Sequence, residues 1–247
     1  MVLTRFTVSF HRFIIIMITC VILTITLALK SVFATTSTIN NLEIGYELAR
    51  HGEFDKAAQY FEEALSSNNP SQYDIRLALG RIYSAQSRET EALTMFSQNI
   101  EHTPNRPESY FRRGQLFASR NDHRSAITDF LQSIRRYDEE EDAVDVYLEL
   151  ASSTRTLCDQ SAEFHHCIEK AVHFARHATE LNPTRADAFH LLGYLESSSD
   201  PRLGLQHLQI AKSLSNTQTS MILLEDLARV SIRTGNMNQA VSYVMLK

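Results

Sequence analysis

The sequence predicts an all-α protein, an α-solenoid of about five to six stacked helical hairpins preceded by one hydrophobic N-terminal helix. Small and aromatic residues recur at a period of about 34 residues over 38–247, and such a period indicates stacked structural repeats. The chain also holds only 7 glycines and 5 prolines among 247 residues, and no tryptophan. This composition favours helices over strands.

The composition also limits the class of protein. Hydrophobic residues make up 43% of the chain and charged residues 21%, as in folded rather than disordered proteins. The net charge is −5, and residues 1–34 carry three basic residues and no acid, which leaves 21 Lys and Arg against 29 Asp and Glu. We therefore expect no nucleic-acid partner.

The N-terminal segment has the features of an export signal. Residues 13–29 form a sustained apolar run with two arginines before it, and Val32 and Ala34 have the small-residue spacing after which signal peptidases cleave. Residues 1–34 are thus a cleaved signal peptide ending at Ala34 or an uncleaved single-pass anchor in the membrane. A buried core helix is disfavoured by the flanking charges. Both favoured alternatives leave the N-terminus in the cytosol and the bulk of the chain in the periplasm or a secretory lumen.

The repeat is clearest from three glycines. Gly45, Gly80 and Gly114 stand 35 and 34 residues apart, and each is followed by alanine at +12 and phenylalanine at +16. A small residue fills the same slot in three further repeats, at Ala151, Gly193 and Ala228. The expected repeats are 38–71, 73–106, 107–140, 144–185 with an insertion, 186–218 and 221–247.

The small slot predicts close packing within each hairpin. We expect the absent side chain to let the helix that carries the +12 alanine approach closely, and the +16 aromatic to wedge against the next hairpin. In the turns between helices, Gly52 and Gly235 are expected to be left-handed. Helix starts are expected at Ser71, Pro107 and Thr184.

These spacings resemble the tetratricopeptide repeat, a helix–turn–helix of about 34 residues with a small residue in the first helix, alanines and an aromatic in the second, and a closing proline. Pro70 and Pro104 close the first two repeats. The later repeats match less well, since Glu196 and Ser231 stand where an aromatic is usual. The resemblance covers about residues 38–247.

The resemblance implies a concave groove, lined by the first helix of each hairpin, that holds a protein or peptide partner. Aromatic side chains interleaved with arginines there suit a peptide with apolar and acidic groups; a generic solvated helix face is the alternative. By register, the groove candidates are Tyr46, Arg50, Arg81, Phe111, Gln115, His190, Tyr194 and Arg229.

The insertion in the fourth repeat holds the most unusual residues. Cys158 and Cys167 bracket it, and in an oxidising compartment they would form a disulfide, whereas in the cytosol they would stay free thiols. His173 and His177 have the i,i+4 spacing that can share a metal, with His166 on about the same face. No acid motif accompanies them, so we expect solvated histidines and no metal.

The sequence contains no phosphate loop, no G-x-S-x-G and no H-E-x-x-H, and we expect neither enzymatic activity nor a cofactor. The function predicted is an exported or membrane-tethered scaffold for an envelope or secretory-lumen assembly. The alternative is a metal- or redox-responsive module built on the two cysteines and the histidines. The last repeat ends with an apolar face at Val241, Val244 and Met245. We expect this face to meet a partner, a second copy of the chain, or a region missing from a truncated gene product.

Overall fold

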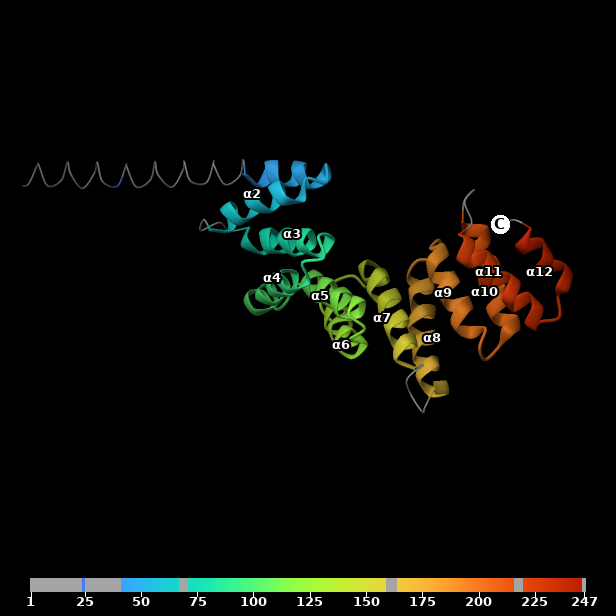
Figure 1. Ribbon diagram of the computed structural model, residues 1–247. Helices are drawn as coiled ribbons and strands as arrows, with labels where there is room; N and C mark the ends of the chain where they lie inside the picture. Colours follow the sequence, from blue (N-terminus) through green and yellow to red (C-terminus); the bar gives the residue numbers. More distant parts are fainter. Residues whose placement is uncertain (1–23, 25–40, 67–70, 159–163, 216–219, 246–247) are drawn as a thin grey trace, which may run out of the picture. The chain divides into compact units, whose positions relative to one another are not determined.

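The computed structural model describes residues 24, 41–66, 71–158, 164–215 and 220–245 (Figure 1). These residues form helices joined by turns, with no strand among them, so the predicted all-α fold of helical hairpins is confirmed. The predicted signal or anchor lies outside them except for residue 24. None of the helices in the described part has the length and apolar character needed to cross a membrane.

Residues 41–50 are helical, and each later helix follows its predecessor through a turn or a short connection. The helices are α2 (Phe54–Ser66), α3 (Gln72–Ala85), α4 (Glu89–His102), α5 (Pro107–Ser119), α6 (His123–Ile134), α7 (Val144–Cys158), α8 (Phe164–Leu181), α9 (Ala186–Glu196), α10 (Pro201–Leu214), α11 (Met221–Arg233) and α12 (Met237–Val244), with a 3-10 turn at Glu140–Ala143 before α7.

The chain divides into two compact units, Met1–Met95 and Phe96–Lys247, with the division inside α4. We call them the N-terminal and C-terminal units and describe each by itself. In the C-terminal unit each helix from α5 to α12 packs on the next one along the chain. This sequential packing is the pattern expected of stacked hairpins.

The small slots receive the aromatic ring of their own hairpin. A Cβ added to Gly114 would lie 2.6 Å from Cε1 of Phe130, and one added to Gly45 would lie 3.0 Å from Cζ of Phe61. The carbonyl oxygen of Ala126, at +12, is further away at 3.3 Å. The expected close approach of the helix that carries the +12 alanine is confirmed for the hairpin of Gly114, and the +16 ring on the same helix comes closer still to the slot.

The same aromatic also packs onto the following hairpin. Phe130 is fully buried and belongs to a cluster with Val146 and Leu150 of α7. The predicted wedge against the next hairpin is thus confirmed for this repeat. In the fifth repeat, Gly193 faces Gly204 and Leu208, which occupy the +12 and +16 slots after a one-residue deletion.

A left-handed residue stands seven positions after the small slot in four of the hairpins. Gly52 and Gly235 have φ of 78° and 81°, which confirms the prediction for these turns. Ser87 and Asn121 occupy the same place with φ of 60°. The hairpin turn therefore requires positive φ at this position even where the residue carries a side chain.

The helix starts are predicted with mixed success. Pro107 begins α5 as expected, and Gln72 begins α3 directly after Ser71, although the Ser71 side chain makes no capping hydrogen bond. The start at Thr184 is wrong, because α9 begins at Ala186. Its hydroxyl donates to Oδ1 of Asn182 at 2.8 Å instead of capping the helix.

Candidate peptide-binding pocket

Five of the predicted groove residues line two pockets, and the other three lie outside both. Tyr46, Arg50 and Arg81 line a pocket of the N-terminal unit. Phe111 and Gln115 line a pocket of the C-terminal unit. The remaining three, His190, Tyr194 and Arg229, line neither of these pockets.

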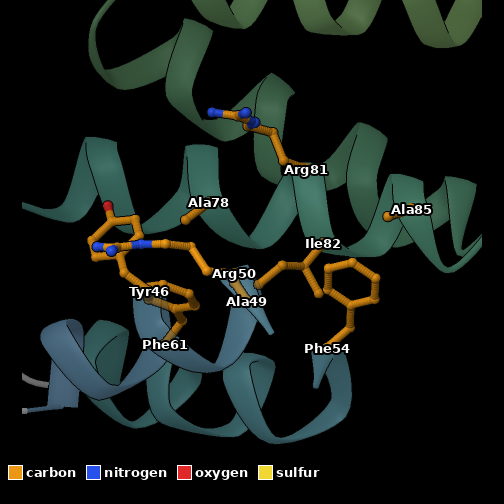
Figure 2. A pocket seen from close by; sticks show the side chains of 9 residues that line it. All are labelled: Tyr46, Ala49, Arg50, Phe54, Phe61, Ala78, Arg81, Ile82 and Ala85. Atoms are coloured by element: carbon orange, nitrogen blue, oxygen red, sulfur yellow. The ribbon is translucent and has the colours of Figure 1, made fainter. Parts of the chain in front are cut away.

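The pocket of the N-terminal unit has a volume of about 410 Å³. Phe54 and Ile82 lie at one end of it, and Tyr46 and Arg50 at the other (Figure 2). Its lining comes from the helix at 41–50, from α2 and from α3: Tyr46, Ala49, Arg50, Phe54, Phe61, Ala78, Arg81, Ile82 and Ala85.

Helical periodicity explains why these side chains converge. Residues 46, 49 and 50 are spaced i, i+3, i+4, and residues 78, 81, 82 and 85 are spaced i, i+3, i+4, i+7, so each set forms one face of its helix. Three of the lining positions are alanines, at 49, 78 and 85. Their short side chains leave the space between the two faces open.

The aromatic floor of this pocket consists of two packed rings. The rings of Tyr46 and Phe61 pack edge to face with centroids 5.0 Å apart, a favourable arrangement for aromatic pairs. Phe61 is fully buried, whereas Tyr46 is 40% exposed. Burial raises the pKa of the Tyr46 hydroxyl, Asp74 adds to this rise and Arg81 opposes it, so at neutral pH the hydroxyl is a neutral group that can donate a hydrogen bond.

The two arginines of the pocket are available to a ligand. Arg81 forms no hydrogen bond or ion pair with any residue that the structure describes. Arg50 lies 3.2 Å from Glu47, with side chains 72% and 58% exposed, and such exposed pairs are weak. Arg50 can therefore exchange Glu47 for a ligand carboxylate. Arg81, whose side chain points away from Arg50 in Figure 2, can pair with a second carboxylate.

The pocket of the C-terminal unit is of similar volume, about 420 Å³, but its charges are already paired. Arg185 lies 2.9 Å from Asp145 and 2.6 Å from Asp187. The hydrogen bond from Arg185 lowers the pKa of Asp187. Gln115 donates to Glu149 at 3.0 Å. This pocket is less suited to a charged ligand, because binding there has to break internal ion pairs.

His190 and Arg229 meet at a buried carboxylate that the sequence analysis did not identify. Asp226 of α11 is 5% exposed; His190 Nε2 lies 2.9 Å from its Oδ2, and Arg229 donates to its Oδ1 at 2.9 Å. Tyr194 lies apart from them under the guanidinium of Arg155, 5.7 Å from ring centroid to Cζ. His190 and Arg229 therefore contact a carboxylate of the protein itself.

Glu196 is a second buried carboxylate. It is 3% exposed, and it accepts hydrogen bonds from Arg176 at 2.6 Å and from His207 Nδ1 at 2.5 Å. The departure from the aromatic pattern at this position was visible in the sequence. Its partners were not, because they belong to the neighbouring helices α8 and α10.

Cys158 and Cys167 form a disulfide with their Cα atoms 5.4 Å apart. The bond joins the end of α7 to the first turns of α8. The nearby histidines are not brought to one point: the ring of His177 packs on Tyr147, that of His173 lies by Phe174, and the side chain of His166 lies outside the described residues. Within the described part, no group of three or more His, Cys, Asp or Glu could hold a metal.

The apolar surface expected at the last repeat is exposed in the structure. Val241 and Val244 are 53% and 54% exposed, and Met245 is 81% exposed. Whether a second copy of the chain covers this surface stays a prediction.

Solved structures with the same fold are helical repeat proteins. The chain is similar to PilF of Pseudomonas aeruginosa, with 12% identity and a TM-score of 0.72 over 86% of this chain and 91% of that one. It is also similar to PilW, described as a widely conserved type IV pilus biogenesis factor, with 15% identity and a TM-score of 0.70 over 83% and 90% of the two chains. YrrB, described as a TPR protein with an unusual peptide-binding site, shows 15% identity and a TM-score of 0.58 over 75% and 89%.

At these identities the likeness concerns the fold alone. A search of curated protein sequences found no match. A family profile of the tetratricopeptide repeat matches residues 42–107, a range that contains the whole lining of the N-terminal pocket. Residues 42–107 therefore match the tetratricopeptide repeat, and the chain shares the fold of the solved helical repeat proteins.

Proposed function

We propose that this protein is a non-enzymatic scaffold that binds a segment of a partner protein in the pocket of its N-terminal unit. The observation that carries the proposal is the combination found there: an aromatic floor, an open apolar space and two arginines without strong internal partners. Interaction sites are enriched in aromatic residues and arginine for these physical reasons. Tetratricopeptide folds are in general interaction scaffolds, which supports the proposal.

We further propose that the protein works outside the cytosol, in an assembly of the cell envelope or of a secretory lumen. The disulfide between Cys158 and Cys167 supports this location, because disulfides persist in oxidising compartments. The apolar run before the repeats is the second support. The pilus-biogenesis description of PilW makes envelope assemblies of that kind the first ones to examine.

A photo-crosslinking amino acid in place of Ala85 tests the binding role in living cells. Ala85 lines the pocket and is exposed, so the full-length protein tolerates the change. We expect a light-dependent adduct of defined mass, identified by mass spectrometry, that disappears in an Arg81→Gln background. The matched control places the same amino acid at Gln59, an exposed position of α2 outside the pocket. Equal adducts from both positions, or none from Ala85, would contradict the proposal.

Alkylation of thiols in intact cells tests the location. Intact cells are treated with a permeant maleimide reagent, one sample directly and a second sample after reductant has been added. The protein is then separated and its labelling is compared between the two samples. We expect Cys158 and Cys167 to escape labelling until the reductant is added. Full labelling in untreated cells would show reduced cysteines and would exclude the oxidising compartment.

The redox half of the alternative function also rests on this disulfide, whereas its metal half lacks a cluster of ligands in the described part. Metal analysis of the purified protein decides between the scaffold and the metal-responsive module. Stoichiometric zinc that is lost in a His173→Ala, His177→Ala variant would favour the metal-responsive module over the scaffold.

A further inference from the structure

We propose that the N-terminal pocket selects a partner segment in which one bulky apolar side chain is flanked by carboxylates. This inference rests on the proposed function, in that the pocket must be the partner-binding site. It adds the chemistry that the partner must carry.

The apolar end of the pocket accounts for the bulky side chain. Phe54 and Ile82 lie at this end (Figure 2), and the alanines at 49 and 85 widen the space between helices. The volume of about 410 Å³ is at the small end of the range for ligand pockets, roughly 300–1,000 Å³. It suits one or two side chains of an extended segment better than a whole helix.

The two arginines of the lining account for the carboxylates. Arg50 and Arg81 lie on neighbouring helices and both line the pocket, with their side chains directed apart in Figure 2. Two acids act near them: Glu47 pairs with Arg50, and Asp74 acts on the Tyr46 hydroxyl. Glu47 and Arg50 are both well exposed, so a ligand carboxylate can replace Glu47 at little cost. Arg81 has no internal partner to give up among the described residues.

The geometry also disfavours a basic segment. A lysine or arginine in the ligand would meet the guanidinium group of Arg50 or Arg81, or the uncharged apolar wall at Phe54 and Ile82. An acidic segment without a bulky side chain would pair with the arginines and leave the apolar end filled with water. Both halves of the pocket are satisfied only by a ligand that combines the two chemistries.

Fluorescence anisotropy with three labelled, capped pentapeptides tests the inference on the full-length protein. The first peptide carries phenylalanine between two glutamates, the second phenylalanine between two lysines, and the third alanine between two glutamates. We expect the first to bind about tenfold or more tightly than either of the others, since the lysine peptide lacks both carboxylates and the alanine peptide lacks the buried ring. Affinity for the first peptide should fall as salt is added.

Variants of the pocket supply the second half of the test. Arg81→Gln should weaken binding of the first peptide by about tenfold, and Ala85→Glu should abolish it by filling and charging the apolar end. Lys56→Gln is the matched control, because it also removes one positive charge from an exposed side chain of the N-terminal unit, outside the pocket. It should leave binding within about twofold of the wild type. Circular dichroism spectra establish that each variant is folded.

The inference is overturned if the lysine peptide or the alanine peptide binds as tightly as the first, or if Arg81→Gln and Lys56→Gln behave alike. It is also overturned if none of the peptides binds. In each of these cases a crosslinked partner at Ala85 in cells would leave the scaffold function intact and show that the pocket recognises other chemistry. Absence of the crosslink at Ala85 would contradict the proposed scaffold function itself.

Discussion

The backbone of Gly114 lies directly against the ring of Phe130. A methyl group at position 114 would stand 2.6 Å from Cε1 and 2.8 Å from Cδ1 of a ring that is fully buried. Contacts of this length do not occur between real side chains, so the ring or the helix has to move. The same relationship exists between Gly45 and Phe61, with more room.

Gly114→Ala is therefore expected to destabilise the protein. Overpacking costs about 1–3 kcal/mol, and the higher helix propensity of alanine returns up to about 1 kcal/mol. We expect a net loss of about 1–2 kcal/mol in the free energy of unfolding, measured by urea denaturation. Gly45→Ala is the comparison and should cost less, because its nearest ring atom lies at 3.0 Å. A Gly114→Ala protein as stable as the wild type would refute the packing argument.

The left-handed turn residues predict a stabilising change. Ser87 and Asn121 both have φ of 60°, which is strained for residues with a side chain and more so for serine than for asparagine. Ser87→Gly should raise the free energy of unfolding by up to about 1 kcal/mol, and Asn121→Gly should raise it by less. Gly52→Ala, at the equivalent turn, should lower it by a similar amount. Thermal unfolding measures all three, and a destabilised Ser87→Gly would contradict the strain.

The ion pair between Arg113 and Asp129 is expected to matter more than those at the surface. Arg113 donates to both oxygens of Asp129, at 2.7 and 2.9 Å, and Asp129 is 4% exposed. Asp129→Ala leaves the guanidinium without its carboxylate and should cost about 3 kcal/mol. Asp187→Ala, which removes a carboxylate whose side chain is 59% exposed, should cost about 1 kcal/mol or less. Equal losses in denaturant titrations would mean that burial does not set the strength of these pairs.

The stability of the protein should depend on the ionisation of Tyr83 at high pH. Burial and the hydrogen bond to Glu62 raise the pKa of the Tyr83 hydroxyl to about 12, against about 10 in the unfolded chain. Because the folded value is the higher one, this contribution to stability is complete below pH 10 and is lost as the pH rises through 12. Tyr83→Phe should therefore lose less stability than the wild type between pH 10 and pH 12.

Absorbance at the tyrosinate band measures the same ionisation directly. The difference between the titrations of the wild type and of Tyr83→Phe should have its midpoint near 12. A midpoint near 10 would show that the hydroxyl is free in solution.

Removing the disulfide should destabilise the hairpin formed by α7 and α8. The bond closes a loop with a sequence separation of 9 residues, for which the chain-entropy relation gives about 2–3 kcal/mol. Cys158→Ala with Cys167→Ala should lower the free energy of unfolding of the C-terminal unit by this amount. Reductant should lower the stability of the wild type and leave the double variant unchanged. If reductant lowered the stability of both proteins equally, the disulfide would not be the cause, and the prediction would be contradicted.

Much of the fold could be predicted because a repeat states the same physical requirement several times. The small slot, the +16 aromatic and the left-handed turn each recur, so that a single weak signal becomes a strong one. The start of α9 was missed because Thr184 is one local signal without repetition. Its hydroxyl turned to Asn182, a competing local partner that a cap motif does not take into account.

The candidate site could be predicted only in part. Tyr46, Arg50 and Arg81 converge because their register along two packed helices determines the faces on which they lie. His190 and Arg229 share the same register, yet they face Asp226, 36 residues after His190. The role of this aspartate depends on a neighbouring hairpin, and the pattern of its own helix does not reveal it.

The sequence by itself determined the period, the helices and the residues that pack within each hairpin, because these are properties of short stretches with fixed helical spacing. Only the tertiary structure decided which charged groups neutralise one another. Arg113 and Asp129 come from paired helices, and Glu196 is held by Arg176 and His207 from the helices on its two sides. Such pairs form where two helices approach within a few ångström, and the strength of a charge contact depends on that distance and on burial. Among the residues that line the N-terminal pocket, Arg50 has only an exposed partner and Arg81 has none among the described residues, which is why the proposed binding site rests on them.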